Sequence, residues 1–191
     1  MPSTRDVPFS DSFHSLLTCF LRQRVRYCLI GALAVAAWGT SRATQDIDCL
    51  VLLGKRELAR LLAALNRRGF TVDAGWAEHN PLLREHWVRL RRGGIPVDLL
   101  RPRDLHDRQT VTRRRVKVLQ RQRIWVARPE DLIIMKLKAG RHRDFDDILS
   151  LIVEQGSRLD QRYLRRWAKR LGVWQELMYC LTQSKPPAQG R

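Results

Sequence analysis

The segment 46–53 places two aspartates at the start of an otherwise apolar strand. Asp46 and Asp48 are two residues apart, and side chains at i and i+2 face the same side of a strand. Both carboxylates should therefore project together, while Ile47 and Cys49 face the core. Like charges this close repel unless a cation lies between them, and Mg²⁺, which prefers oxygen ligands, is the natural candidate.

Two further features favour such a site over the alternative reading of an isolated D-x-D, a solvated strand face. Asp98 lies within the apolar strand 95–100, where a carboxylate is costly unless it is paired or bound to metal. The strand 27–30 runs into Gly31 and Ala32 and then a helix. Small residues there let backbone N–H groups approach a phosphate at a helix N-terminus.

The remaining pattern is typical of an α+β fold, a small mixed sheet flanked by helices and followed by a C-terminal helical part. We expect strands at 27–30, 46–53, 70–73, 86–92, 95–100 and 124–127. We expect helices at 10–22, 32–38, 55–68, 131–138, 144–154, 161–171 and 173–181. The chain should divide into a core at 1–128, a helical part at 129–183 and a disordered tail at 184–191.

The charge of the chain points to a polyanionic partner. The 191 residues include 36 Lys and Arg against 19 Asp and Glu, a net charge of +17. Nucleic acid is the first candidate and an anionic membrane surface the second, and an arginine-favouring genome is the alternative explanation. The longest uncharged apolar stretch, 28–38, is too short to cross a bilayer. We expect a cytoplasmic protein with no membrane partner.

The four cysteines argue against a zinc site. They form no C-x-x-C pair and have no histidine at metal-ligand spacing. Their neighbours in the sequence are apolar, which predicts buried free thiols in a reducing compartment.

Two stretches of sequence resemble a known family. The first, 29–48, reads L-I-G-A-L-A-V-A-A-W-G-T-S-R-A-T-Q-D-I-D, and the second, 129–148, reads P-E-D-L-I-I-M-K-L-K-A-G-R-H-R-D-F-D-D-I. Together with Asp98 they resemble the nucleotidyltransferase superfamily with the DNA polymerase β-like fold. The details are most similar to the bacterial AbiEii-type subgroup, some members of which are toxins of toxin–antitoxin pairs. Ala32 is a departure, because the family has serine or glycine there.

The resemblance implies how the carboxylates would act. Asp46, Asp48 and Asp98 would hold two Mg²⁺ ions and promote an in-line displacement at the α-phosphate of a nucleoside triphosphate. Asp98 would lie nearest the attacking hydroxyl group and could take its proton. Pyrophosphate would leave, and the nucleotide would remain on the acceptor.

The resemblance also implies a set of nucleotide-binding residues: Gly31, Ala32, Arg42, Thr44 and Lys136. Two of them have alternative interpretations. Arg42 could be a plain surface residue of a loop. Lys136 could extend its stem along the apolar surface, or it could pair with Asp144 or Asp147.

The acceptor is predicted from the distribution of charge. The stretch between Asp107 and Glu130 contains no acidic residue, and we expect it to border the active site and bind RNA. The residues assigned to RNA binding are Arg113, Arg114, Arg115, Lys117, Arg121 and Arg123. A second basic cluster lies at 162–170.

Several functions remain open at this point. RNA is the leading acceptor, with the 3′ end of a tRNA as one form of it, and a small molecule such as an antibiotic or a protein hydroxyl group is the alternative. The basic stretch could instead contact an antitoxin protein. A catalytically inactive relative that binds nucleic acid is the third reading, and the intact set of three aspartates argues against it.

Overall fold

The structure is a computed structural model that describes residues 7–39, 44, 46–80, 83, 85–119 and 121–184. Its strands are β1 (Tyr27–Ile30), β2 (Ile47–Val51), β3 (Thr71–Val72), β4 (Trp87–Arg92), β5 (Ile95–Leu100), β6 (Arg115–Leu119) and β7 (Gln122–Val126). Its helices are α1 (Phe9–Arg22), α2 (Gly31–Ala36), α3 (Lys55–Asn66), α4 (Ala74–His79), α5 (Leu105–Arg113), α6 (Pro129–Ala139), α7 (Asp144–Gln155), α8 (Gln161–Arg170) and α9 (Trp174–Gln183). The α+β prediction is confirmed.

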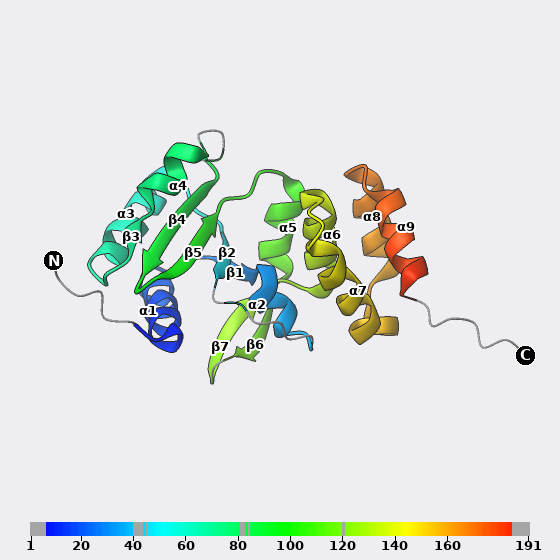
Figure 1. The fold of residues 1–191 in the computed structure, drawn as a ribbon, viewed down its shortest axis with the longest axis horizontal. Coiled ribbons are helices and arrows are strands. Elements are labelled where there is room, and N and C mark those ends of the chain that lie inside the picture. Colours follow the sequence, from blue (N-terminus) through cyan, green and yellow to red (C-terminus); the bar gives the residue numbers. More distant parts are fainter. Residues whose placement is uncertain are drawn as a thin grey trace, which may run out of the picture.

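The strands of the described residues form one mixed sheet in the order β3-β4-β5-β2-β1-β7-β6 (Figure 1). The neighbours β2 and β5 run parallel, as do β1 and β7, and the other neighbouring pairs are antiparallel. The long connection between β2 and β5 contains α3, α4 and the antiparallel strands β3 and β4. This connection places β5 beside β2, and the candidate site forms across this strand pair.

The helices lie around the sheet and beyond one end of it. Helix α1 packs on α3, whereas α2 and α5 contact the central strands β1 and β2. Helices α6 and α7 pack together beside α5, and α8 and α9 follow at the end of the molecule where the described chain stops (Figure 1). Helix α6, expected at 131–138, begins two residues earlier at Pro129, and its C-cap residue Gly140 has a φ of +62°.

The core is centred on β1, β2 and β5. Ile47, Cys49 and Val51 are fully buried, as the alternation along β2 predicted. All four cysteines are buried and free, which confirms the prediction of buried thiols. No helix in the described part of the chain is both long and apolar enough to span a membrane.

Three elements were missed by the sequence prediction: α4, α5 and β6. Helices α4 and α5 begin at aspartate caps, where Asp73 accepts a hydrogen bond from the Trp76 backbone and Asp104 from the Asp107 backbone. Helix α4 has only six residues and α5 is mostly polar, so the apolar periodicity of both is weak. Strand β6 is an edge strand with mostly exposed side chains. Its sequence therefore shows no clear apolar alternation within the basic stretch.

The predicted tail at 184–191 lies outside the described residues apart from Ser184, which caps α9.

Candidate active site

The three predicted carboxylates meet at the pairing of β2 with β5. Asp48 and Asp98 are register partners on these parallel strands, so their side chains lie next to each other on the same face. Asp46 precedes β2 and lies two residues before Asp48; its side chain is exposed, whereas Asp98 is only 2% exposed. All three residues line the same cavity.

Gly31 lets the Asp48 carboxylate lie against the start of α2. Its φ is +66°, and a Cβ atom built at this position would lie 2.0 Å from Oδ2 of Asp48. Strands β1 and β2 pair with Ile30 opposite Asp48, which brings the end of β1 to the carboxylate. The sequence predicted that a phosphate could approach the backbone at Gly31 and Ala32. The structure adds that Gly31 packs against Asp48, a predicted metal ligand.

The electrostatics around Asp48 favour a bound cation. Burial, with the nearby charges of Asp98 and Asp46, raises the pKa of Asp48 to about 7. A carboxylate in such surroundings regains its charge at neutral pH when a cation is bound beside it. Asp46 and Asp48 together offer oxygen donors, the chemistry that a hard divalent ion such as Mg²⁺ prefers. These two residues therefore fit the metal that the resemblance implies.

Asp98 has a different partner. Arg89 on β4 is its register partner in the β4–β5 hairpin, and the two side chains form a bidentate ion pair. Arg89 Nε donates to Oδ1 of Asp98 at 2.8 Å, and Nη2 donates to Oδ2 at 2.6 Å. The sequence prediction missed Arg89, although a two-residue turn at Gly93 and Gly94 would have placed it opposite Asp98.

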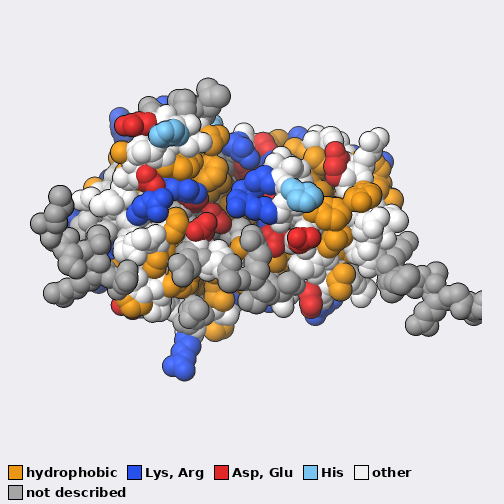
Figure 2. Space-filling model, viewed as in Figure 1, with side chains coloured by type: hydrophobic (Ala, Val, Ile, Leu, Met, Phe, Trp, Pro, Cys, Tyr) orange, Lys and Arg blue, Asp and Glu red, His pale blue; other side chains and the backbone are white. Residues whose placement is uncertain are grey.

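The carboxylates line a cavity of about 420 Å³, a size typical of small-molecule sites. Figure 2 shows acidic side chains near the middle of this face with basic side chains on both sides of them. Gly31, Ala32 and Thr44 line the cavity as well, and Arg42 lies outside the described residues. The basic residues of the wall are Arg89, Arg101, Arg103, Lys136, Lys138, Arg141 and Arg143.

Lys136 reaches this wall from α6 but is held by acidic residues of α7. Its Nζ lies 3.0 Å from Oδ1 of Asp144 and 2.6 Å from Oδ2 of Asp147. The side chain is only 6% exposed. Lys136 therefore forms the ion pairs that were one of its interpretations from the sequence. Because Lys136 also lines the cavity, its contact with phosphate stays a prediction.

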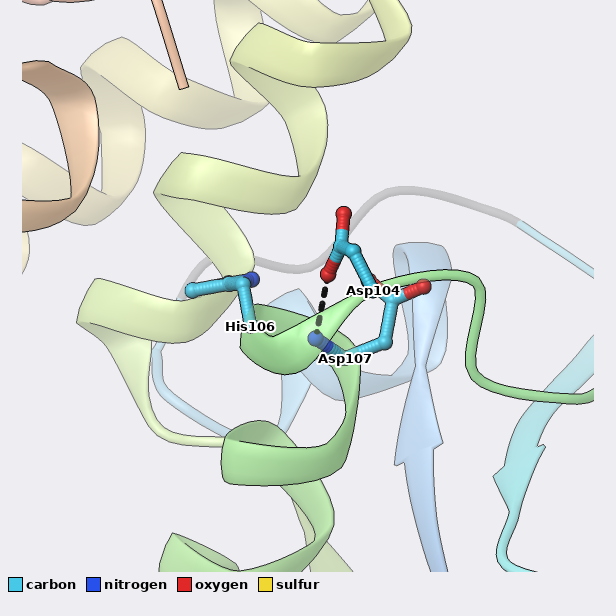
Figure 3. A group of neighbouring side chains, drawn as sticks. All are labelled: Asp104, His106 and Asp107. Carbon is cyan, nitrogen blue, oxygen red and sulfur yellow. Dashed lines mark hydrogen bonds between the residues drawn. The ribbon is translucent and has the colours of Figure 1, made fainter. Parts of the chain in front are cut away.

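A second group of potential metal ligands lies on α5 and just before it: Asp104, His106 and Asp107 (Figure 3). Their ligand atoms lie within 4.8 Å of one another. The ammonium group of Lys138 already contacts Asp104 at 2.6 Å and Asp107 at 2.7 Å. This ammonium group already bridges the two carboxylates, so we assign no metal there.

The six predicted RNA-binding residues are dispersed, and none of these described residues lines the cavity. Arg113 is turned inward, with Nη2 3.5 Å from Glu130 and its guanidinium 3.6 Å from the ring centre of Tyr163. Arg114 donates to the carbonyl of Val111. Lys117 lies over the Trp38 ring, and the exposed residues are Arg115, Arg121 and Arg123.

Residues 18–175 match the model of a family described as "Nucleotidyltransferase of unknown function (DUF6036)". The chain belongs to this nucleotidyltransferase family. The match spans both the carboxylate-bearing strands and the helices α6 to α8. A search of curated proteins found no match.

Solved structures share the fold of this nucleotidyltransferase at low sequence identity. The solution structure of the antibiotic-resistance factor ANT(2'')-Ia is 11% identical, covers 92% of this chain and 99% of its own, and has a TM-score of 0.60. The crystal structure of ANT(2'')-Ia with adenylyl-2''-tobramycin is also 11% identical, with coverages of 83% and 95% and a TM-score of 0.58. Lincomycin-bound LnuA, a lincosamide antibiotic adenylyltransferase, is 18% identical, with coverages of 77% and 98% and a TM-score of 0.53.

Proposed function

We propose that this nucleotidyltransferase moves a nucleotide from a nucleoside triphosphate to a hydroxyl group of an acceptor. The observation that carries the proposal is the register pairing of Asp48 with Asp98, with Asp46 beside them, on the wall of a cavity rich in basic side chains. Family membership supports the same reaction class. A bound divalent cation, for which we propose Mg²⁺, would neutralise charge that builds up at the α-phosphate.

Each group of side chains has a part in this reaction. Asp46 and Asp48 would hold the cation, and the exposed Arg103 and Arg143 would neutralise the outer phosphates. The acceptor oxygen forms a bond to the α-phosphorus as the bond from that phosphorus to the bridging oxygen breaks, and pyrophosphate leaves with the electron pair. The role of Asp98 as proton acceptor stays a prediction, since both of its oxygens accept hydrogen bonds from Arg89.

The test of this activity is transfer of label from each α-labelled nucleoside triphosphate in the presence of Mg²⁺. Asp46→Asn should reduce transfer by about 100-fold or more, the order seen when one group that stabilises the transition state is removed. The matched control is Asp146→Asn, which removes an exposed carboxylate of α7 and should transfer normally. Full activity of the Asp46→Asn protein would refute the assignment.

RNA is the acceptor that we propose first, because the net charge of +17 suits a polyanion. Two exposed basic surfaces support it. Strands β6 and β7 and their turn carry Arg115, Arg121 and Arg123, and α8 carries the exposed residues Arg162, Arg165, Arg166, Lys169 and Arg170. Tyr163 and Trp167 of α8 are buried, so α8 offers charge and not a stacking surface for bases.

The RNA proposal is tested by titrating total RNA at two salt concentrations. Replacing Arg115, Arg121 and Arg123 by alanine should weaken binding, and the salt slope should fall by about 0.7 for each phosphate that the protein no longer neutralises. A control variant with the same loss of charge replaces three exposed arginines elsewhere, Arg56 and Arg60 of α3 and Arg67 directly after it. Equal affinity of both variants and the wild type would exclude RNA binding by β6 and β7.

A small-molecule acceptor is the second candidate, because the cavity has the volume of such sites. The structural relatives named for antibiotics, ANT(2'')-Ia and LnuA, make aminoglycosides and lincosamides the first compounds to assay. Label that appears on an antibiotic and not on RNA would decide for this candidate.

The AbiEii-type affinity, a toxin role and an antitoxin partner stay predictions from the sequence resemblance. Induced expression tests the toxin role. Growth arrest by the wild type that Asp46→Asn abolishes would support it, and unaffected growth would count against it.

A further inference from the structure

Arg89 is part of the carboxylate cluster, because it pairs directly with Asp98. It stands opposite Asp98 in the β4–β5 hairpin and meets both carboxylate oxygens, at 2.8 and 2.6 Å. A bidentate pair of this kind fixes the plane of the carboxylate as well as neutralising it. Asp98 is 3% exposed at its side chain, so water contributes little to its solvation and Arg89 is its principal counter-charge.

Two tryptophan rings also lie close to the guanidinium group of Arg89. Its carbon lies 5.3 Å from the ring centre of Trp76 and 5.8 Å from that of Trp87, and the two indole rings pack with centres 4.9 Å apart. Moving Arg89 away from Asp98 would give up these cation–π interactions together with two charge-assisted hydrogen bonds. It would also leave a buried carboxylate unpaired.

The charge of the cluster then matches one divalent cation. Asp46, Asp48 and Asp98 carry three negative charges when ionised, and Arg89 returns one positive charge, which leaves a net charge of −2. We propose that Arg89 is a built-in cation for Asp98, so that the cluster holds a single divalent ion between Asp46 and Asp48. The inference rests on the proposed function and changes its metal content from the two ions that the resemblance implies to one.

This arrangement gives Asp98 and Arg89 a positioning role. The pair joins β4 to β5 and holds a guanidinium group at the cavity wall, which is also lined by the acidic residues that would bind the ion. Because the positive charge of Arg89 offsets the negative charge of Asp98, no second divalent ion is needed to do so.

The test counts bound Mn²⁺ per chain by electron paramagnetic resonance of the free ion, with no substrate present. We expect one Mn²⁺ in the wild type and none in Asp46→Asn, which identifies the ion. In Arg89→Met, which keeps the length of the stem but loses the charge, we expect two. Arg91→Met is the matched control, because Arg91 also pairs with an aspartate, Asp73 at 2.7 Å, and should leave one ion.

A charge-neutral double variant covers the case in which Arg89→Met does not fold. Arg89→Met with Asp98→Asn removes both members of the pair, so no buried charge is left alone. If Asp98 is not a ligand, this variant should bind one Mn²⁺ with an affinity close to that of the wild type. If Asp98 is a ligand, its affinity should fall by roughly 10-fold or more.

The outcomes separate this inference from the proposed function. Two Mn²⁺ ions in the wild type, one in a folded Arg89→Met protein, or a 10-fold loss in the double variant would each overturn the single-ion arrangement and leave the nucleotidyl transfer proposal standing. No bound Mn²⁺ in the wild type would overturn the metal site on which both depend.

Discussion

Gly31 is the residue whose replacement should disturb the site most directly. Any side chain there would have to adopt a φ of +66° and would also occupy the space of the Asp48 carboxylate. Only glycine meets both conditions, since the left-handed region is costly for residues with a Cβ atom. The small residue that the sequence assigned to phosphate approach is therefore also required by the packing of a predicted metal ligand.

Gly31→Ala should lower Mn²⁺ affinity by roughly 10-fold or more, because Asp48 must move away from the new methyl group. It should also lower the free energy of unfolding by about 1–2 kcal/mol through backbone strain. Calorimetric titration with Mn²⁺ and denaturant unfolding measure the two effects.

The control for this prediction is Gly94→Ala in the β4–β5 turn. Gly94 also has a positive φ, +81°, but a Cβ atom there would meet nothing within 4 Å. It should lose similar stability and keep its Mn²⁺ affinity. Normal metal binding by Gly31→Ala would mean that the packing of Gly31 against Asp48 has no bearing on the metal site.

Helices α6 and α7 form an element pair joined through a buried ammonium group. Lys136 of α6 lies between Asp144 and Asp147 at the start of α7, and all three side chains are nearly excluded from water. Removing one partner of a buried ion pair leaves a charge without compensation, which costs more than the pair itself contributes. These ion pairs therefore hold the start of α7 against α6 beside the cavity.

Lys136→Met should lower the free energy of unfolding by about 3–5 kcal/mol in urea. Lys169→Met, on the exposed face of α8, is the control and should change it by less than about 0.5 kcal/mol. A Lys136→Met protein that keeps its stability but loses affinity for nucleoside triphosphates would favour the phosphate-contact reading instead.

A buried polar network joins α5, α6 and α8 across the molecule. Asp131 of α6 accepts hydrogen bonds from the Tyr163 hydroxyl and from Arg113, and it lies beside His106 and Glu130. Burial raises the pKa of Asp131 to about 6, and burial lowers the pKa of His106 to about 4. His106 is therefore neutral at pH 7, and its contact with Asp131 is not an ion pair there.

The two shifts act on stability in opposite directions. The raised pKa means that folded Asp131 binds its proton more tightly than the unfolded chain does, so its contribution to stability falls as pH rises from about 4 to about 6. The lowered pKa means that unfolded His106 binds its proton more tightly, so its contribution is lost as pH falls from about 6.5 to about 4. In the wild type the two slopes largely cancel.

Single substitutions should separate these slopes. Relative to the wild type, Asp131→Asn should gain about 2–3 kcal/mol of unfolding free energy between pH 4 and pH 6. His106→Gln should lose a similar amount over pH 4 to 6.5. Denaturant unfolding in a pH series measures both, and parallel profiles for the wild type and Asp131→Asn would show that Asp131 keeps an ordinary pKa.

Much of the fold follows from local sequence because its signals act over short distances. Alternating apolar residues predicted β2, and the local patterns at 86–92, 95–100 and 131–138 predicted β4, β5 and α6. Helix α5 and strand β6 escaped this reasoning, since a polar helix and an edge strand bury too few apolar side chains to leave a periodic pattern.

From the residues alone, the two-residue period of a strand predicted that Asp46 and Asp48 face one side, and both line the same cavity. Tertiary packing sets Asp98 level with Asp48, because the register of parallel strands depends on how the long connection packs between them. It also decided which charges are paired. Arg89 holds Asp98 and Lys136 holds α7, since burial from water forces each charge to find a partner within reach.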